Sequence, residues 1–180
     1  MFFEKSMSVN CKLSLEEPCL ITKILVGVDG SENSEKALDY ALEIAEKFSA
    51  SVLILNVFQP PPEFGYQINM FQQAPSSGYP QRPIGYQPNM ISVINDLRKM
   101  HEEVLSKATE RATKLKPALK ITAELKEGYA PSQIVEAAAN GKIDLIVIGH
   151  RGDSQIKELF LGSTSERVAH QATCPVLIAK

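Results

Sequence analysis

The stretch Ile143-Asp-Leu-Ile-Val-Ile-Gly-His-Arg-Gly152 joins an apolar segment to two closely spaced glycines. Nine residues later the chain reads Gly162-Ser-Thr164, where a new helix can begin. The apolar segment predicts a buried parallel strand, and open α/β sheets bind ligands beyond the carboxyl ends of such strands. Glycine lets the backbone approach a ligand closely, and a helix N-terminus attracts anions. Together the two segments predict a cradle for a polyphosphate.

Outward from this stretch, strand and helix patterns alternate. Continuous apolar runs predict buried strands, and alternation of apolar and polar residues at 120–127 predicts a half-exposed strand at a sheet edge. Apolar residues at helical spacing predict helices between the strands. The predicted strands are Ile24–Val28, Val52–Val57, 120–127, Ile143–Ile148 and Pro175–Ala179, and the predicted helices run to Phe48, from Met90 to Leu115, from Pro131 to Gly141 and from Ser163 onward. Strands that alternate with helices indicate an α/β fold with an open parallel sheet.

The same residues resemble a known family. The spacing Gly-x2-Gly-x9-Gly-Ser/Thr, formed by Gly149, Gly152 and Gly162, is similar to that of the ATP-binding branch of the universal stress protein family. The chain also resembles this family in its first strand and turn, its second strand, and its last helix and strand. These segments are Lys23–Ser31, Val52–Val57, Leu159–Val168 and Cys174–Lys180.

The resemblance implies an adenine nucleotide alpha hydrolase-like fold with strand order 3-2-1-4-5 and helices on both faces. It implies ATP as the ligand, or AMP or another adenine nucleotide, with Mg²⁺ or Mn²⁺ held through the phosphates. A homodimer through the apolar edge strand 175–179 is also expected, because family members commonly pair there and an uncovered apolar edge invites aggregation. A protein partner is expected, of unknown identity.

The resemblance further assigns nucleotide-facing roles to particular residues. Asp29 would bind ribose hydroxyls or the adenine amine, although Asp-Gly is also a common turn pair. Val28, Val57 and Ile148 would form the apolar wall of the adenine pocket while also serving as core. The phosphate-facing set is Gly149, Arg151, Gly152, Gly162, Ser163 and Thr164. Ser163 has a second explanation as the N-cap of a capping box with Glu166, and the glycines could be turn residues.

Composition places limits on the remaining chain. With 180 residues, the expectation is a flexible extension at 1–21 and a single domain at 22–180. A Pro- and Tyr-rich insertion at about 59–89 holds seven of the eleven prolines and repeats Gly-Tyr-Gln-x-Asn-Met, starting at Gly65 and at Gly85. This composition favours a disordered loop, and the alternative is a tyrosine-bearing flap or a docking strip for a partner.

Charge and cysteine content exclude several classes of protein. A net charge of −2 gives no general attraction to nucleic acid or anionic membrane, and no apolar run approaches the ~20 residues of a transmembrane helix. The three cysteines are odd in number and show no Cys-x-x-Cys spacing, and the three histidines sit in separate segments, so neither set predicts a metal site. A soluble cytoplasmic protein is therefore predicted, with neither nucleic acid nor membrane as a partner.

The resulting functional prediction is an ATP-binding regulator or sensor of the stress response, whose nucleotide controls conformation or partner binding. Three alternatives stay open: a slow ATPase, a nucleotide-independent dimeric interaction protein, and a binder of AMP or a cyclic nucleotide. No Ser/His/Asp or Cys/His set stands in register, so no catalytic residue is assigned. Arg151 alone offers little for phosphoryl transfer, and any hydrolysis should be slow.

Overall fold

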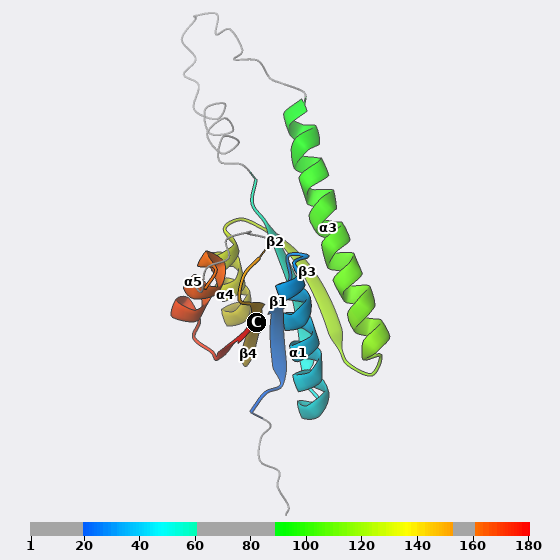
Figure 1. Cartoon of the computed structure of the whole chain (residues 1–180), viewed down its shortest axis with the longest axis vertical. Helices are drawn as coiled ribbons and strands as arrows, with labels where there is room; N and C mark the ends of the chain where they lie inside the picture. The colour runs from blue at the N-terminus through cyan, green and yellow to red at the C-terminus, as the bar shows by residue number, and fades with distance from the viewer. Residues whose placement is uncertain (1–19, 61–88, 153–160) are drawn as a thin grey trace, which may run out of the picture.

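The computed structural model describes residues 20–60, 89–152 and 161–180. Strands and helices alternate along this part of the chain, as the sequence predicts (Figure 1). The strands are β1 (Lys23–Gly27), β2 (Ser51–Phe58), β3 (Ile121–Glu127), β4 (Leu145–Gly149) and β5 (Val176–Ala179). The helices are α1 (Glu32–Phe48), α3 (Asn89–Leu115), α4 (Ala130–Gly141) and α5 (Ser163–Gln171).

The five strands form one sheet in the order β3-β2-β1-β4-β5, and every neighbouring pair is parallel. The predicted fold class and strand order are confirmed. From the central strand β1 the chain builds the sheet outward through β2 and β3, and then crosses to the other side of β1 for β4. This reversal makes the gap between the carboxyl ends of β1 and β4 the topological switch point, where open α/β sheets bind ligands.

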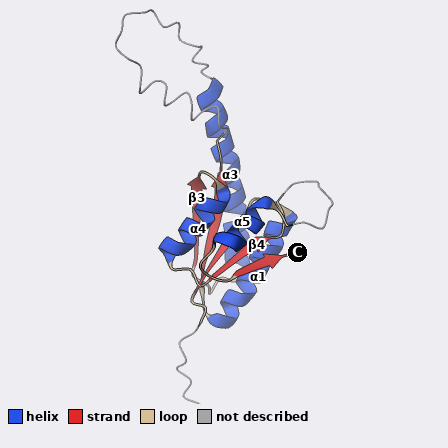
Figure 2. Ribbon diagram, turned by 90° about the vertical axis from the view of Figure 1, so that its left-hand side faces the viewer, coloured by secondary structure: helices blue, strands red, loops and turns tan. Residues whose placement is uncertain are grey.

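Helices cover both faces of the sheet (Figure 2). Because successive strand residues point to opposite faces, Ile24 and Val26 of β1 pack in one apolar cluster with α1 and α3. Leu25, between them, packs in a second cluster on the other face with α4 and α5. The two layers bring helix ends from both faces to the carboxyl edge of the sheet.

The two edge strands differ in character. β3 carries exposed residues along its middle, which confirms the half-exposed edge predicted from its alternating sequence. Among the described strands β5 has one partner, β4, and its apolar residues Val176 to Ile178 are only partly buried. The interior strand β4, by contrast, is buried over Leu145–Ile148.

Some local predictions are wrong. The fourth strand begins at Leu145, because the Ile143 amide still bonds to Ala138 O at the end of α4. The end of α4 at Gly141 is as predicted, and Lys142, with φ 51°, takes the left-handed position after it. Ser163 is not the N-cap of α5, since Gly162 occupies that position and no side chain caps the helix. Phe48, placed on the apolar stripe of α1, is 43% exposed.

Other predictions concern residues outside the described ranges. Most of the N-terminal extension at 1–21 and of the insertion at 59–89 lies in residues 1–19 and 61–88, so the expectations for both stay predictions. None of the helices in residues 20–60, 89–152 and 161–180 combines the length and apolar content of a transmembrane span.

Candidate functional site

The carboxyl end of β1 is held by hydrogen bonds from β2. The Val28 amide donates to Leu55 O at 2.9 Å, and Asn56 Nδ2 donates to Val28 O at 2.7 Å. Asn56 is 1% exposed, and its Oδ1 lies 2.7 Å from Nδ1 of His101 on α3. These contacts fix the backbone immediately before Asp29.

Asp29 lies in the turn between β1 and α1, which Gly30 completes with φ +86°. Its Oδ1 accepts hydrogen bonds from the Ser31 amide at 3.0 Å and from Ser31 Oγ at 2.6 Å. Ser31 is in turn the N-cap of α1 and accepts from the Ser34 amide. One carboxylate oxygen of Asp29 therefore has the turn-stabilising role that the sequence left open, while Oδ2 faces Gly152.

Each glycine of the predicted motif has close neighbours. A Cβ on Gly149 would lie 2.9 Å from the backbone of Asn33 in α1, so β4 and α1 can approach only because this residue has no side chain. A Cβ on Gly152 would collide with Oδ2 of Asp29. A Cβ on Gly162 would lie 3.2 Å from His150 O, which also accepts the Gly162 amide at 2.9 Å. The two glycine segments thus contact each other directly.

The N-terminus of α5 is attached to the end of β4 by a serine. Ser165 is 4% exposed, and its hydroxyl donates to Gly149 O at 2.7 Å. The first hydrogen bond of α5 runs from the Glu166 amide to Gly162 O. The backbone amides of residues 163–165 lie in the first turn of α5 and have no acceptors within the helix. This end of the helix is therefore suitable for an anion.

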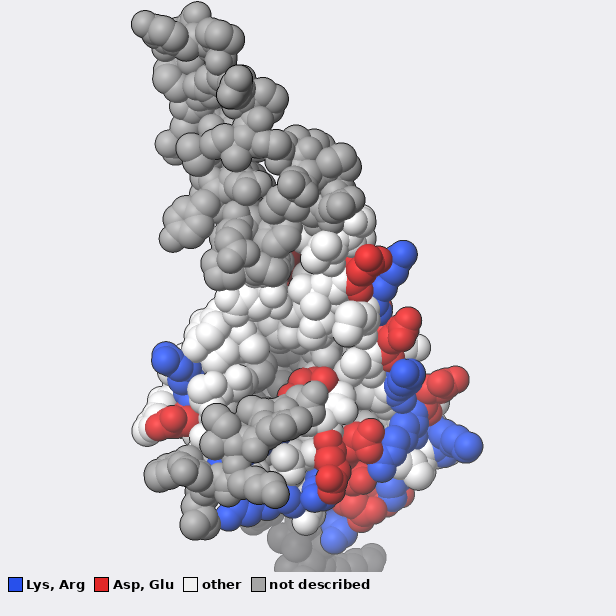
Figure 3. Space-filling view, turned by 45° about the horizontal axis from the view of Figure 1, so that its top comes forward, with Lys and Arg blue, Asp and Glu red and all other residues white. Residues whose placement is uncertain are grey.

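A cavity of about 140 Å³ lies at the switch point. It brings together eight of the ten predicted site residues: Val28, Asp29, Val57, Ile148, Gly149, Arg151, Gly152 and Thr164. Gly162 and Ser163 do not line the cavity, although they stand directly before Thr164. Figure 3 shows the carboxyl end of the sheet as a hollowed, mostly uncharged surface with charged side chains gathered to one side.

The remaining lining residues were not found from the sequence. Leu55, Ala130 and Ile134 complete an apolar wall, and Ser34 and Ser165 add hydroxyls. Leu55 and Ile134 look like ordinary core residues, and their strand and helix positions carry no chemical signal. The motif does not identify Ser165, because its partner Gly149 O is distant in sequence. Ser34 donates to the nearby Ser31 O, a local contact that carries no signal of a ligand site.

Two histidines stand close to the site. Burial lowers the pKa of His101, and the nearby Asp29 carboxylate partly opposes this effect. The pKa of His150 is also lowered, first by burial and then by the positive charges of Arg151 and Lys180. Both shifts favour the neutral imidazole at neutral pH. Among the residues described, no group of three or more His, Cys, Asp or Glu side chains is arranged to hold a metal ion.

The fold and the cavity define an α/β protein with a small cavity at the switch point of a parallel sheet. Sequence comparison identifies the family within this class. The family model for the universal stress protein family matches residues 21–180. Universal stress protein MJ0531 of Methanocaldococcus jannaschii is 34% identical over 162 residues, covering 89% of this chain and 83% of the relative. The chain belongs to the universal stress protein family.

Solved structures agree with this assignment. Universal stress protein UspA from Lactobacillus plantarum superimposes with a TM-score of 0.67 at 23% identity, covering 88% of this chain and 97% of its own. A universal stress protein solved in complex with cAMP gives a TM-score of 0.61 at 27% identity, covering 88% of this chain and 97% of its own. The similarity to UspA concerns the fold alone. The second structure is that of a relative in complex with an adenine nucleotide.

Proposed function

We propose that this protein binds an adenine nucleotide, ATP in the first instance, and acts as a regulator or sensor of the stress response. The observation that supports the proposal is the cavity at the switch point, which gathers eight residues predicted from the sequence on separate segments. A relative of similar fold is described in complex with cAMP, which supports the adenine nucleotide class.

The chain offers a distinct surface to each part of a nucleotide. The apolar wall of Val57, Ile134 and Ile148 suits the flat face of a base. The cavity is smaller than the roughly 300–1,000 Å³ of typical small-molecule pockets, so it would hold the base while the rest of the nucleotide extends outward. Asp29 lines the cavity and would accept hydrogen bonds from ribose hydroxyls through Oδ2.

The phosphates would lie against the two glycine segments. Backbone amides of Ser163 and Thr164 stand at the N-terminus of α5, where the helix dipole favours negative charge. Gly152 leaves room beside Asp29, and Arg151 brings a positive charge to the cavity wall. Mg²⁺ or Mn²⁺, held mainly by the phosphates and water, would offset part of the phosphate charge.

The identity of the nucleotide determines how the site would signal. A triphosphate would engage both glycine segments and connect the end of β4 to α5. A cyclic monophosphate would reach fewer of these amides, and the relative in complex with cAMP makes it the second candidate. In either case the bound nucleotide would change the surface presented to a protein partner.

We also propose that the protein forms a homodimer through residues 175–179. The support is the apolar edge strand β5, which pairs with β4 on one side and has partly buried apolar side chains. Pairing with the same strand of a second copy would cover this edge and its open hydrogen-bonding groups.

Equilibrium binding of ATP, AMP and cAMP, each with and without Mg²⁺, tests the nucleotide proposal. The full chain should bind one adenine nucleotide per chain, with ATP most tightly and with a gain from Mg²⁺. Asp29→Asn should weaken binding of all three nucleotides, whereas the control Asp96→Asn, an exposed change on α3, should not. Absence of binding by all three at millimolar concentration would reject the proposal, and tightest binding of cAMP would replace ATP as the ligand.

A further inference from the structure

A second cavity, of about 320 Å³, lies between α1 and α3 on the opposite face of the sheet from the apolar wall of the first. Its floor is apolar, formed by Val28, Leu38, Val104 and Ala108. Three charged residues also line it: Glu35 from α1, and Lys107 and Arg111 from α3. An apolar cavity with a few polar groups that converge on it is the usual form of a small-molecule site.

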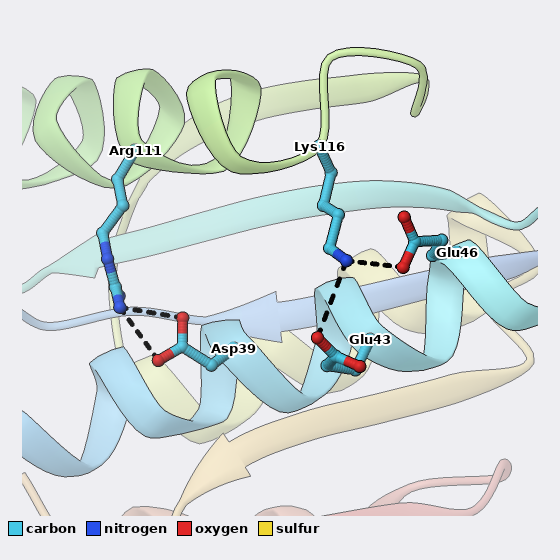
Figure 4. Close-up of polar contacts among 5 residues, drawn as sticks. All are labelled: Asp39, Glu43, Glu46, Arg111 and Lys116. Carbon is cyan, nitrogen blue, oxygen red and sulfur yellow. Dashed lines mark hydrogen bonds and ion pairs between the residues drawn. The ribbon is translucent and has the colours of Figure 1, made fainter.

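The charged residues belong to an incomplete series of ion pairs between the two helices. Arg111 pairs with Asp39 at 2.9 Å, and further along both helices Lys116 pairs with Glu43 and Glu46 (Figure 4). Glu35 and Lys107 stand four residues before Asp39 and Arg111, so they would form the next pair of the series. Neither makes an ion pair with any described residue, and the cavity opens at this position.

The balance of charge limits what the cavity can hold. Asp39 neutralises Arg111, which leaves one positive group, Lys107, and one negative group, Glu35, on the lining. A simple anion would also face Glu35, and a simple cation would also face Lys107. A zwitterion satisfies both groups with opposite ends. Among the described residues, the buried Nη1 atom of Arg111 has no hydrogen-bond acceptor, and a ligand carboxylate in the cavity that Arg111 lines would offer one.

We infer that the cavity between α1 and α3 binds a small zwitterion with an apolar body, an aliphatic α-amino acid being the matching class. Its carboxylate pairs with Lys107, its ammonium group pairs with Glu35, and its side chain lies on Val28, Leu38 and Val104. The site is separate from the proposed nucleotide site, although Val28 and Ser34 line both cavities. The inference does not depend on nucleotide binding.

Titration of the isotope-labelled full chain with L-leucine, followed by NMR, tests the inference. Leucine at millimolar concentration should shift amide signals of residues lining this cavity, such as Val104 and Ala108. Two analogues separate the charges: 4-methylpentanoate lacks the ammonium group and 3-methylbutylamine lacks the carboxylate. Each should bind about tenfold more weakly, as expected for the loss of one charge-assisted contact.

Substitutions of two exposed cavity residues, each with a charge-matched control variant, complete the test. Lys107→Gln and Glu35→Gln should each weaken leucine binding about tenfold. Lys114→Gln and Glu110→Gln remove the same charges from α3 outside the cavity and should leave the affinity unchanged. The inference is overturned if leucine produces no shifts in the cavity, if the shifts centre on Val57 and Ile148, if either analogue binds as tightly as leucine, or if both cavity variants bind normally.

Discussion

Gly149 and Gly152 stand in one sequence motif but are required for different physical reasons. A side chain at Gly149 would meet the rigid backbone of Asn33, whereas a side chain at Gly152 would meet the movable carboxylate of Asp29. The first glycine therefore serves the packing of β4 against α1. The second keeps space free beside the proposed ligand.

This difference predicts effects of different size on stability from the same substitution. Gly149→Ala should lower the free energy of unfolding by about 1–3 kcal/mol, since overpacking against backbone cannot be relieved by a side-chain rotation. Gly152→Ala should change stability by less than about 0.5 kcal/mol, as expected at an exposed position. Urea denaturation measures both values. Equal destabilisation by the two substitutions would contradict this account.

The Gly152→Ala variant also tests the proposed nucleotide site. Gly152→Ala places a methyl group where Asp29 Oδ2 now lies, so the carboxylate must move. ATP affinity should fall about tenfold, the equivalent of one lost hydrogen bond to a charged group. Calorimetric titration of this folded variant against wild type gives the ratio, and an unchanged affinity would remove Gly152 and Asp29 from the site.

Asp144 gives stability a defined dependence on pH. Its Oδ2 accepts from the Thr22 amide, the Thr22 hydroxyl and the Lys23 amide, and hydrogen bonding from Thr22 is the main cause that lowers its pKa. Because the folded pKa lies below the unfolded value, the unfolded chain binds more protons as pH falls. The contribution is complete at neutral pH and is lost as pH falls from about 4 through the lower folded value.

Asp144→Asn should therefore be less stable than wild type at pH 7, and the difference should shrink in acid. Urea denaturation at pH 7 and at about pH 3 measures the change. Glu124→Gln, on the exposed middle of β3, is a suitable control because it removes one carboxylate without removing these hydrogen bonds. A stability difference for Asp144→Asn that stays constant over this pH range would show that the carboxylate charge is unimportant.

At the scale of elements, a part-buried polar contact joins α3 to the interior of the sheet. Asn56 of β2 bonds to both Val28 O and His101, so its amide connects β1, β2 and α3. Asn56→Leu should cost about 1–3 kcal/mol, because it leaves a buried carbonyl and a ring nitrogen without their partner. The loss includes the desolvation of both groups.

A double-mutant cycle separates the contact between Asn56 and His101 from the rest. His101→Leu should cost less in the Asn56→Leu background than in wild type, with a coupling of about 1 kcal/mol. Denaturation of the four proteins measures this coupling. Strict additivity would indicate that the two side chains make no energetically significant contact.

Element positions were largely predictable from the sequence, whereas element ends and cavity walls were not. Apolar runs such as Val52–Val57 are long enough to identify buried strands without any structure. The N-cap of α5 was misassigned because Ser163 and Gly162 are both acceptable caps, and the choice depends on the Gly162 amide bonding to His150 O. Ser165 and Asn56 were missed since their partners are backbone groups brought close only by the fold.

At the scale of the whole molecule, the edge of the sheet at β5 is a surface that no described strand covers. The carbonyl of Pro175 accepts from the Ile146 amide of β4, and that of Ala179 accepts from the His150 amide directly after β4. Since the backbone groups of successive strand residues point to alternate sides, those of Val176 and Ile178 point away from the sheet. An apolar strand with outward hydrogen-bonding groups is suited to pairing with a second copy.

The proposed homodimer can be tested with one charged substitution on this strand. Leu177→Lys should convert the protein from dimer to monomer, because the same lysine on both copies would stand near the two-fold axis and repel its equivalent. Sedimentation equilibrium measures the mass, and circular dichroism with thermal unfolding confirms that each monomer is folded. Met100→Lys, at a 64% exposed position on α3, adds the same charge away from β5 and should remain dimeric. A folded Leu177→Lys variant that stays dimeric would move the interface elsewhere, and a monomeric wild type would leave the edge strand uncovered in solution.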